Sequence, residues 1–208
     1  MDWVSSAWLP PRQFLLIKAI EENINSIGIL RSIADDELEL MRAWRNEPAV
    51  RANMYTQHEI SREEHLTWWK KTQTRTDQKY FIYEMAGTPF GIAAFTCIDI
   101  HSQNSAWAFY SSPMAPRGAG SKMEFLMLDY AFATLQLQKL YCEVLAFNAP
   151  VIKLHKKFGF KVEGVFRYQH KLGDNFVDTY RLGILAPEWL EQRQAMLEKL
   201  TGQTRALK

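Results

Sequence analysis

The sequence predicts an α/β fold in which helices flank a mixed β-sheet of about seven strands. Three observations support this prediction. Strand-like and helix-forming segments follow one another in the order β-α-α-β-β-β-α-β-α-β-β, which is typical of helices packed on a sheet. The apolar run 140–147 lies between two helical segments, as a buried central strand would. A basic loop at 117–122, which carries two glycines, opens the first of these helices.

The first part of the chain predicts one strand and two helices. Residues 28–33 form the strand, and the Asp-Asp pair at 35–36 provides an N-cap and an acidic first turn for the helix that follows. The Arg-Asn-Glu-Pro segment at 45–48 ends that helix, because proline cannot continue it. Ser-Arg-Glu-Glu at 61–64 matches a capping box and opens the second helix.

The remaining elements follow from β-rich runs and turn residues. Asn148 and Pro150 start the helix after the central strand, and Pro187 starts a C-terminal helix. The other strands are expected at 80–85 and 90–98 around the turn 86–89, at 107–111, and at 162–170 and 176–184 around the turn 173–175.

Length and composition suggest one main domain. A chain of 208 residues can bury one sizeable core. Residues 1–26 differ from the rest and are interpreted as an N-terminal extension, residues 27–186 as the domain, and residues 187–208 as a C-terminal helix with a polar tail. The net charge of +2 argues against a nucleic-acid partner, and no apolar run reaches the roughly 20 residues that span a membrane.

The two cysteines point to a reducing compartment. Cys97 and Cys142 lie in apolar, strand-like segments without the spacing of metal ligands. We therefore expect two buried free thiols, no metal site and a cytoplasmic location. The sequence leaves a homodimer open.

Two ordered motifs resemble the GCN5-related N-acetyltransferases, over about residues 28–185. The first is Arg117-Gly-Ala-Gly-Ser-Lys122, although Lys122 stands where the family usually has a small residue; the second is the segment 148–160, Asn-Ala-Pro-Val-Ile-Lys-Leu-His-Lys-Lys-Phe-Gly-Phe. The resemblance implies that the chain binds acetyl-CoA, with its pyrophosphate at 117–122 and its pantetheine between splayed strands at 107–112 and 140–147. The implied contacts are Tyr110, Ser111, Ser112, Arg117, Gly118, Ala119, Gly120, Ser121, Lys122, Asn148 and His155.

The resemblance gives His155 a candidate catalytic role, because the family usually has a tyrosine there that protonates the leaving thiolate. Helical spacing places His155 on the same face as Val151 and Phe158, toward the sheet. An ordinary imidazolium is a stronger acid than an alkyl thiol, so this proton transfer is downhill. A histidine satisfied by a backbone carbonyl in the core is the alternative, and the sequence leaves both open.

Glu143 is the second catalytic candidate. It stands in the middle of the predicted central strand, where a carboxylate is costly unless it is paired or faces a cleft. It is expected either to orient or deprotonate the acceptor amine, or to form a structural ion pair with a nearby Arg or Lys.

A closer resemblance covers the N-terminal half. The segments Arg-Asn-Glu-Pro at 45–48, Met-Tyr at 54–55 and His-Leu-Thr-Trp at 65–68 are similar to the acceptor-site segments of the sugar-nucleotide N-acetyltransferases of the pseudaminic acid pathway. Those enzymes acetylate the 4-amino group of UDP-4-amino-4,6-dideoxy-N-acetyl-β-L-altrosamine, a precursor of a sugar found on bacterial flagellin. The resemblance implies an acceptor pocket formed by Arg45, Met54, Tyr55, His65, Trp68, Trp107 and Glu143. Ordinary core packing is the alternative for each residue.

Together these features predict an acetyl-CoA-dependent N-acetyltransferase that acts on a UDP-linked amino-deoxy sugar. The amine attacks the thioester directly in a ternary complex, and backbone N–H groups near residues 110–112 polarise its carbonyl. Two alternatives remain. The acceptor could instead be a protein N-terminal amine or an antibiotic amine, or the chain could be a non-catalytic acyl-CoA-binding domain.

Overall fold

The structure, a computed structural model, describes residues 26–202. The predicted N-terminal extension therefore lies outside the described residues except for Ser26, as does the end of the C-terminal tail.

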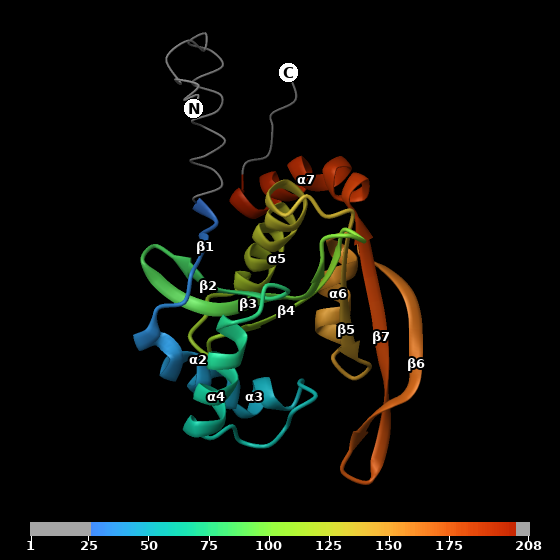
Figure 1. The fold of residues 1–208 in the computed structure, drawn as a ribbon. Coiled ribbons are helices and arrows are strands. Elements are labelled where there is room, and N and C mark those ends of the chain that lie inside the picture. Colours follow the sequence, from blue (N-terminus) through green and yellow to red (C-terminus); the bar gives the residue numbers. More distant parts are fainter. Residues whose placement is uncertain (1–25, 203–208) are drawn as a thin grey trace, which may run out of the picture.

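Seven strands form one mixed sheet, which confirms the predicted fold class (Figure 1). Their order across the sheet is β1-β2-β3-β4-β5-β7-β6. All neighbouring strands are antiparallel except β4 and β5, which are parallel. The strands are β1 (Ile29–Arg31), β2 (Lys79–Met85), β3 (Thr88–Asp99), β4 (Asn104–Ser111), β5 (Lys139–Leu145), β6 (Lys161–Leu172) and β7 (Asn175–Leu185).

Helices form between β1 and β2, between β4 and β5, between β5 and β6 and after β7, as predicted, but the short helix that starts at Pro48 was not predicted. They are η2 (Asp35–Glu37), α2 (Leu38–Asn46), α3 (Pro48–Arg51), α4 (Arg62–Gln73), α5 (Ala119–Asp129), the π-helical turn η3 (Tyr130–Thr134), α6 (Ala149–Lys157) and α7 (Ala186–Thr201). Within residues 26–202, no helix combines the length and the apolar character needed to cross a membrane.

Side chains that alternate along β4 contribute to the two faces of the sheet. Trp107 and Phe109 join the larger core, which α5, α6 and α7 cover, whereas Tyr110 joins a smaller core under α2 and α4. Figure 1 shows α5 and α7 on one side of the sheet and α2 to α4 on the other. Each face of β4 therefore lies under a different set of helices.

The capping contacts at the starts of η2 and α4 differ in part from the prediction. Asp35 and Asp36 do lie in an acidic first turn, but the N-cap is Ala34, whose N–H donates to the Glu37 carboxylate at 2.9 Å. Ser61 caps α4 as predicted, since its hydroxyl accepts from the N–H of Glu64. The Glu64 carboxylate does not complete the capping box; it contacts the ring of His58 at 3.0 Å instead.

The prediction of two buried thiols is correct for Cys142 and wrong for Cys97. Both are free, but Cys97 is exposed. The register between β3 and β4 shifts between Thr96 and Asp99, and Cys97 has a φ of 52°. This local bulge turns its side chain out of the alternation that the apolar pattern implies.

Gly91 provides a test of how closely α5 approaches the sheet. A Cβ at this position would lie 2.7 Å from Sδ of Met123 in α5 and 2.8 Å from the carbonyl oxygen of Tyr110. We expect Gly91→Ala to lower the free energy of unfolding by about 1–3 kcal/mol through overpacking. Denaturant unfolding measures it, with Gly164→Ala as the matched control, because a Cβ there meets nothing within 4 Å. Equal stabilities of the two variants would contradict the close approach.

Candidate active site

The parallel pairing of β4 and β5 covers only the first part of the two strands. Partner residues run from Asn104 and Lys139 to Ala106 and Tyr141, and the pairing stops there. Beyond this point a cavity of about 310 Å³, the inter-strand cleft, opens between the strands. Its lining includes Met54, Trp107, Tyr110, Ser111, Cys142, Glu143, Asn148 and His155. Divergence of these two strands therefore brings both catalytic candidates to one cleft.

The start of α5 presents free backbone N–H groups next to this cleft. Gly118 precedes the helix with a φ of 92°, a left-handed conformation that suits glycine. The N–H groups of Gly120 and Ser121 have no carbonyl partner among the described residues. A Cβ on Gly120 would lie 3.3 Å from Phe109 and 3.6 Å from Leu154, so this helix end packs against β4 and α6. Such a helix start fits a pyrophosphate.

The other residues predicted to contact acetyl-CoA differ in their availability. Asn148 precedes α6 without a side-chain cap bond, so its amide is left to the cleft that it lines. The N–H of Ser112 donates to the Phe90 carbonyl and therefore faces β3. Successive N–H groups along a strand point to opposite sides, so the N–H of Ser111 faces β5. Arg117 is exposed, and Nζ of Lys122 lies 3.2 Å from Sδ of Met85 in β2. The residues 117–122 adjoin the cleft but do not line it.

His155 forms a buried pair with Glu124. The Nδ1 atom of His155 lies 2.8 Å from Oε1 of Glu124, and the two side chains are 3% and 0% exposed. The rings of Trp107, Phe109 and Phe160 surround the imidazole at centroid distances of 5.2 to 6.1 Å. The partner of His155 is thus a carboxylate, not the backbone carbonyl considered above. Burial raises the pKa of Glu124, and the nearby His155 opposes that shift.

Glu143 is paired and faces the cleft at the same time. Oε1 accepts from Nη1 of Arg181, its cross-strand neighbour in β7, at 3.0 Å. Oε2 accepts from the hydroxyl of Tyr55 at 3.0 Å. The predicted ion pair is therefore present, and it uses one carboxylate oxygen while a neutral phenol binds the other. Tyr55 lines neither cavity, but it reaches across to Glu143 from the loop after α3.

Cys142 lines the cleft beside these groups but is poorly suited to act as a nucleophile. Burial, with a contribution from Glu124, raises the pKa of the Cys142 thiol well above its usual value. The thiol is therefore protonated at neutral pH, and the thiolate is the nucleophilic form. This agrees with the predicted direct attack.

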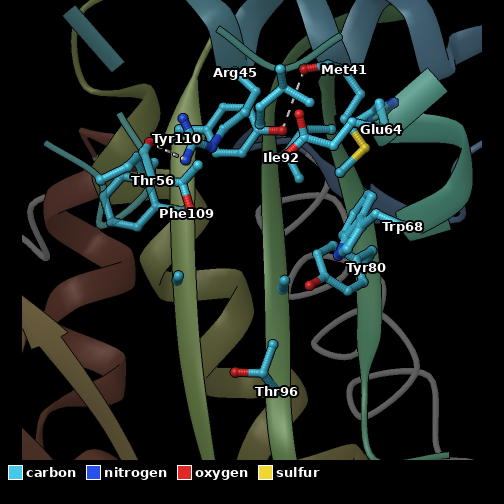
Figure 2. Close-up of a pocket in the computed structure, with 15 residues that line it drawn as sticks. Met41, Arg45, Thr56, Glu64, Trp68, Tyr80, Ile92, Thr96, Phe109 and Tyr110 are labelled. Carbon is cyan, nitrogen blue, oxygen red and sulfur yellow. Dashed lines mark hydrogen bonds between the residues drawn. The ribbon is translucent and has the colours of Figure 1, made fainter. Parts of the chain in front are cut away.

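A second cavity of about 320 Å³, the helix-side cavity, lies between the sheet and helices α2 and α4 (Figure 2). It contains four residues of the predicted acceptor set, namely Arg45, Met54, His65 and Trp68. Trp68 packs edge-on against Tyr80 at a centroid distance of 5.1 Å. The two cavities share the lining residues Met54, Ala108, Phe109 and Tyr110, so they adjoin at β4.

Arg45 has hydrogen-bonding capacity left inside the helix-side cavity. Its Nη2 donates to the Thr56 carbonyl at 2.9 Å, whereas Nη1 is buried and has no partner among the described residues. Burial lowers the pKa of Arg45, which is the expected cost of a guanidinium out of water. Burial likewise lowers the pKa of His65, with a smaller contribution from Arg42. The cavity thus joins an aromatic wall to a donor without a partner.

The structure divides the predicted acceptor set. Trp107 lies in the inter-strand cleft, 2% exposed and stacked on Phe109, and it does not line the helix-side cavity. Glu124 and Arg181 were not predicted. The one signal for Glu124 was an acidic residue inside the apolar stretch 123–128, where it has no polar neighbour in sequence. Within residues 26–202 no group of three His, Cys, Asp or Glu side chains is placed to hold a metal ion.

Comparisons with known proteins agree with this architecture. A family model described as "Acetyltransferase (GNAT) domain" matches residues 29–161. Acetyltransferase PseH of Campylobacter jejuni is 29% identical over 126 residues, covering 61% of this chain and 78% of that protein. Spermidine N(1)-acetyltransferase of Escherichia coli is 24% identical over 175 residues, covering 82% of this chain and 84% of the relative.

Solved structures show the same fold. The crystal structure of spermidine N-acetyltransferase from Vibrio cholerae in complex with CoA and spermine superposes with a TM-score of 0.74 at 21% identity, covering 79% of this chain and 99% of that one. The match to the family model covers most of the region that contains the cleft, the start of α5 and the helix-side cavity. The chain belongs to the GNAT acetyltransferase family and is an acetyl-CoA-dependent N-acetyltransferase.

Proposed function

We propose that the enzyme transfers the acetyl group to the 4-amino group of a UDP-linked amino-deoxy sugar in the cytoplasm, as the resemblance to the pseudaminic acid pathway enzymes implies. The observation that carries this proposal is the guanidinium of Arg45, which lines a cavity with an aromatic wall and whose buried Nη1 has no hydrogen-bond partner within residues 26–202. A diphosphate or a uracil carbonyl supplies the acceptor that this nitrogen lacks. Uracil and the apolar face of a deoxy sugar pack against Trp68 and Tyr80.

The charges around the two cavities argue against a polyamine acceptor. Spermidine would need carboxylates that are free to pair with its ammonium groups. The carboxylates that line the two cavities are Glu64 and Glu143. Glu64 is paired with His58, and Glu143, which is bonded to Arg181 and Tyr55, serves the reacting amine, so neither cavity has a further carboxylate for the other ammonium groups of spermidine. Arg45 would repel a polycation. The match to spermidine N(1)-acetyltransferase nevertheless makes spermidine the competing acceptor to test.

In direct transfer of the acetyl group from acetyl-CoA to the amine, each site residue would have a separate role. When bound, acetyl-CoA supplies the acetyl thioester. The N–H groups of Gly120 and Ser121 hold the pyrophosphate, and the Ser111 N–H, directed toward β5, polarises the thioester carbonyl. Glu143 accepts the proton from the amine, directly or through water, and His155 donates a proton to the departing sulfur. Because the two cavities adjoin at β4, each substrate has its own approach to the reacting centre.

The acceptor is identified by an acetyl-transfer assay that follows release of free CoA. We expect kcat/KM for a UDP-4-amino-4,6-dideoxy sugar to exceed that for spermidine by on the order of 100-fold, because Arg45 attracts the diphosphate and repels the polycation. A peptide with a free N-terminus and an aminoglycoside complete the panel. A preference for spermidine would refute the sugar proposal and leave the acetyltransferase assignment intact.

Arg45 can be tested apart from the donor site. We expect Arg45→Gln to raise KM for the UDP-sugar by roughly 10- to 100-fold, which corresponds to the loss of a charge-assisted hydrogen bond, and to leave KM for acetyl-CoA within about two-fold. Steady-state kinetics with each substrate varied in turn measures both values. Arg62→Gln, which removes an exposed guanidinium at the start of α4, is the control and should change neither. Equal effects of the two substitutions would contradict the assignment.

His155 is tested with a variant that keeps its buried partner bonded. A glutamine amide can donate to Glu124 but cannot transfer a proton, so we expect His155→Gln to lower kcat by about 100-fold or more. Acetyl-CoA affinity, measured by calorimetry, should change by no more than about three-fold. His101→Gln in an exposed turn is the control. Unchanged kcat in His155→Gln, or a wild-type kcat that is constant from about pH 6 to 9, would exclude general-acid catalysis by His155.

A further inference from the structure

Glu124 is a carboxylate in the core with a single polar partner. It lies on α5 within the larger hydrophobic core, is fully buried, and bonds through Oε1 to Nδ1 of His155. Its second oxygen, Oε2, is buried and has no hydrogen-bond partner among the described residues. Burying a carboxylate in this way costs stability, and an apolar side chain would fill the site at lower cost. Stability alone therefore gives no reason for a glutamate here.

The geometry of the pair determines which nitrogen of His155 serves the cleft. An ionised carboxylate can only accept a hydrogen bond, so when Glu124 is ionised the Nδ1 atom that faces it carries the proton. His155 lines the inter-strand cleft, and Nε2 is the ring nitrogen left available to a ligand there. The aromatic rings of Trp107, Phe109 and Phe160 prevent the imidazole from turning freely.

We propose that Glu124 is a positioning residue for acetyl transfer: it fixes His155 with Nδ1–H toward the core and Nε2 toward the cleft, and it stabilises the imidazolium that delivers a proton from Nε2. This proposal rests on the proposed role of His155 as the general acid. Glu124 has no access to the cleft and acts only through His155.

The proton balance of the step is complete. The amine nitrogen forms a bond to the acetyl carbon, the carbon–sulfur bond breaks, and its electron pair stays on sulfur. Nε2 of His155 gives its proton to that thiolate, and the imidazole becomes neutral with its Nδ1–H still bonded to Glu124. The proton that the amine loses, accepted by Glu143 or by water, restores the imidazolium. No oxidant or further reactant is required.

Few other charges act on the pair. Lys157, two residues beyond His155 along α6, lowers the pKa of Glu124, although less than His155 does. The Cys142 thiol on β5 lies near the Glu124 carboxylate and is protonated, so it adds no charge. The β4 and β6 sides present the aromatic rings that surround the imidazole. Among the described residues, Glu124 is thus the one charged side chain that bonds to the imidazole of His155.

The test compares Glu124→Gln with the wild-type enzyme over a range of pH. The amide keeps the size of the side chain and removes its charge, so we expect kcat to fall by about 10-fold or more, with KM for acetyl-CoA nearly unchanged. Without the carboxylate the imidazolium is less stable, so the decline of kcat at high pH should move down by about one pH unit or more. Glu124→Asp, which keeps the charge at a longer distance, should recover part of the pH profile.

Two controls separate positioning from simple structural support. Asp129 also lies on α5 and accepts bonds from Trp189 and Arg193 away from the cleft. We expect Asp129→Asn to lower the melting temperature and leave the pH profile of kcat unchanged. In the His155→Gln background, Glu124→Gln should cause no further loss of kcat, because its route to the reaction is already absent.

A third test measures the tautomer of His155 directly and requires neither acetyl-CoA nor an acceptor. Nitrogen-15 NMR of the His155 ring in the resting enzyme at alkaline pH should show Nδ1 protonated and Nε2 bare. In Glu124→Leu, which cannot accept a hydrogen bond, we expect a mixture of both tautomers. An Nε2-protonated ring in the wild type would overturn the proposal.

The outcomes distinguish this inference from the proposed function. Loss of activity in His155→Gln together with an unaltered pH profile in Glu124→Gln would overturn positioning and keep His155 as the acid. Full activity in His155→Gln would overturn both. If no acceptor in the panel is acetylated, the proposed acceptor class fails, and the tautomer measurement still decides whether Glu124 sets the orientation of His155.

Discussion

The divergence of β4 from β5 is the constraint on which the rest of the site depends. The two strands are joined by a short parallel ladder that ends at Ala106 and Tyr141. On either side, longer antiparallel ladders bind β4 to β3 and β5 to β7, so each half of the sheet holds its own shape. The cleft therefore stays open between two rigid halves, and the backbone groups that line it remain available to a ligand.

Charges buried near this opening give the site its chemical character. Glu124 and His155 form a buried pair, and on the opposite face of β4 Arg45 carries a donor that has no partner in the part of the chain that the structure describes. Each is costly in a protein interior, and such costs are typical of functional sites. Glu143 differs, because Arg181 neutralises it while it still faces the cleft. His155 and Glu143 thus line the inter-strand cleft, whereas Arg45 lines the helix-side cavity.

Much of the fold could be read from the sequence because it depends on local patterns. The order of strands and helices, the turn at Ala86 and Gly87, and the helix start at Asn148 all follow from apolar periodicity and turn residues. The sequence predicted the candidate site only in part. Its motifs include residues around the cleft, yet Trp107 lies apart from Arg45, His65 and Trp68, and Cys97 is exposed rather than buried. Strand register and a bulge decide those two positions, and neither is encoded in a local pattern.

The sequence by itself determined the fold class, the position of the glycine-containing loop that opens α5 and the presence of His155 on the core-facing side of its helix. Only the tertiary structure decided what His155 touches, because Glu124 is 31 residues away in the chain and reaches it through the packing of α5 against α6. The same holds for Glu143, whose partners Tyr55 and Arg181 come from distant segments. Periodicity indicates which way a side chain points, whereas its partner depends on how separate elements pack together.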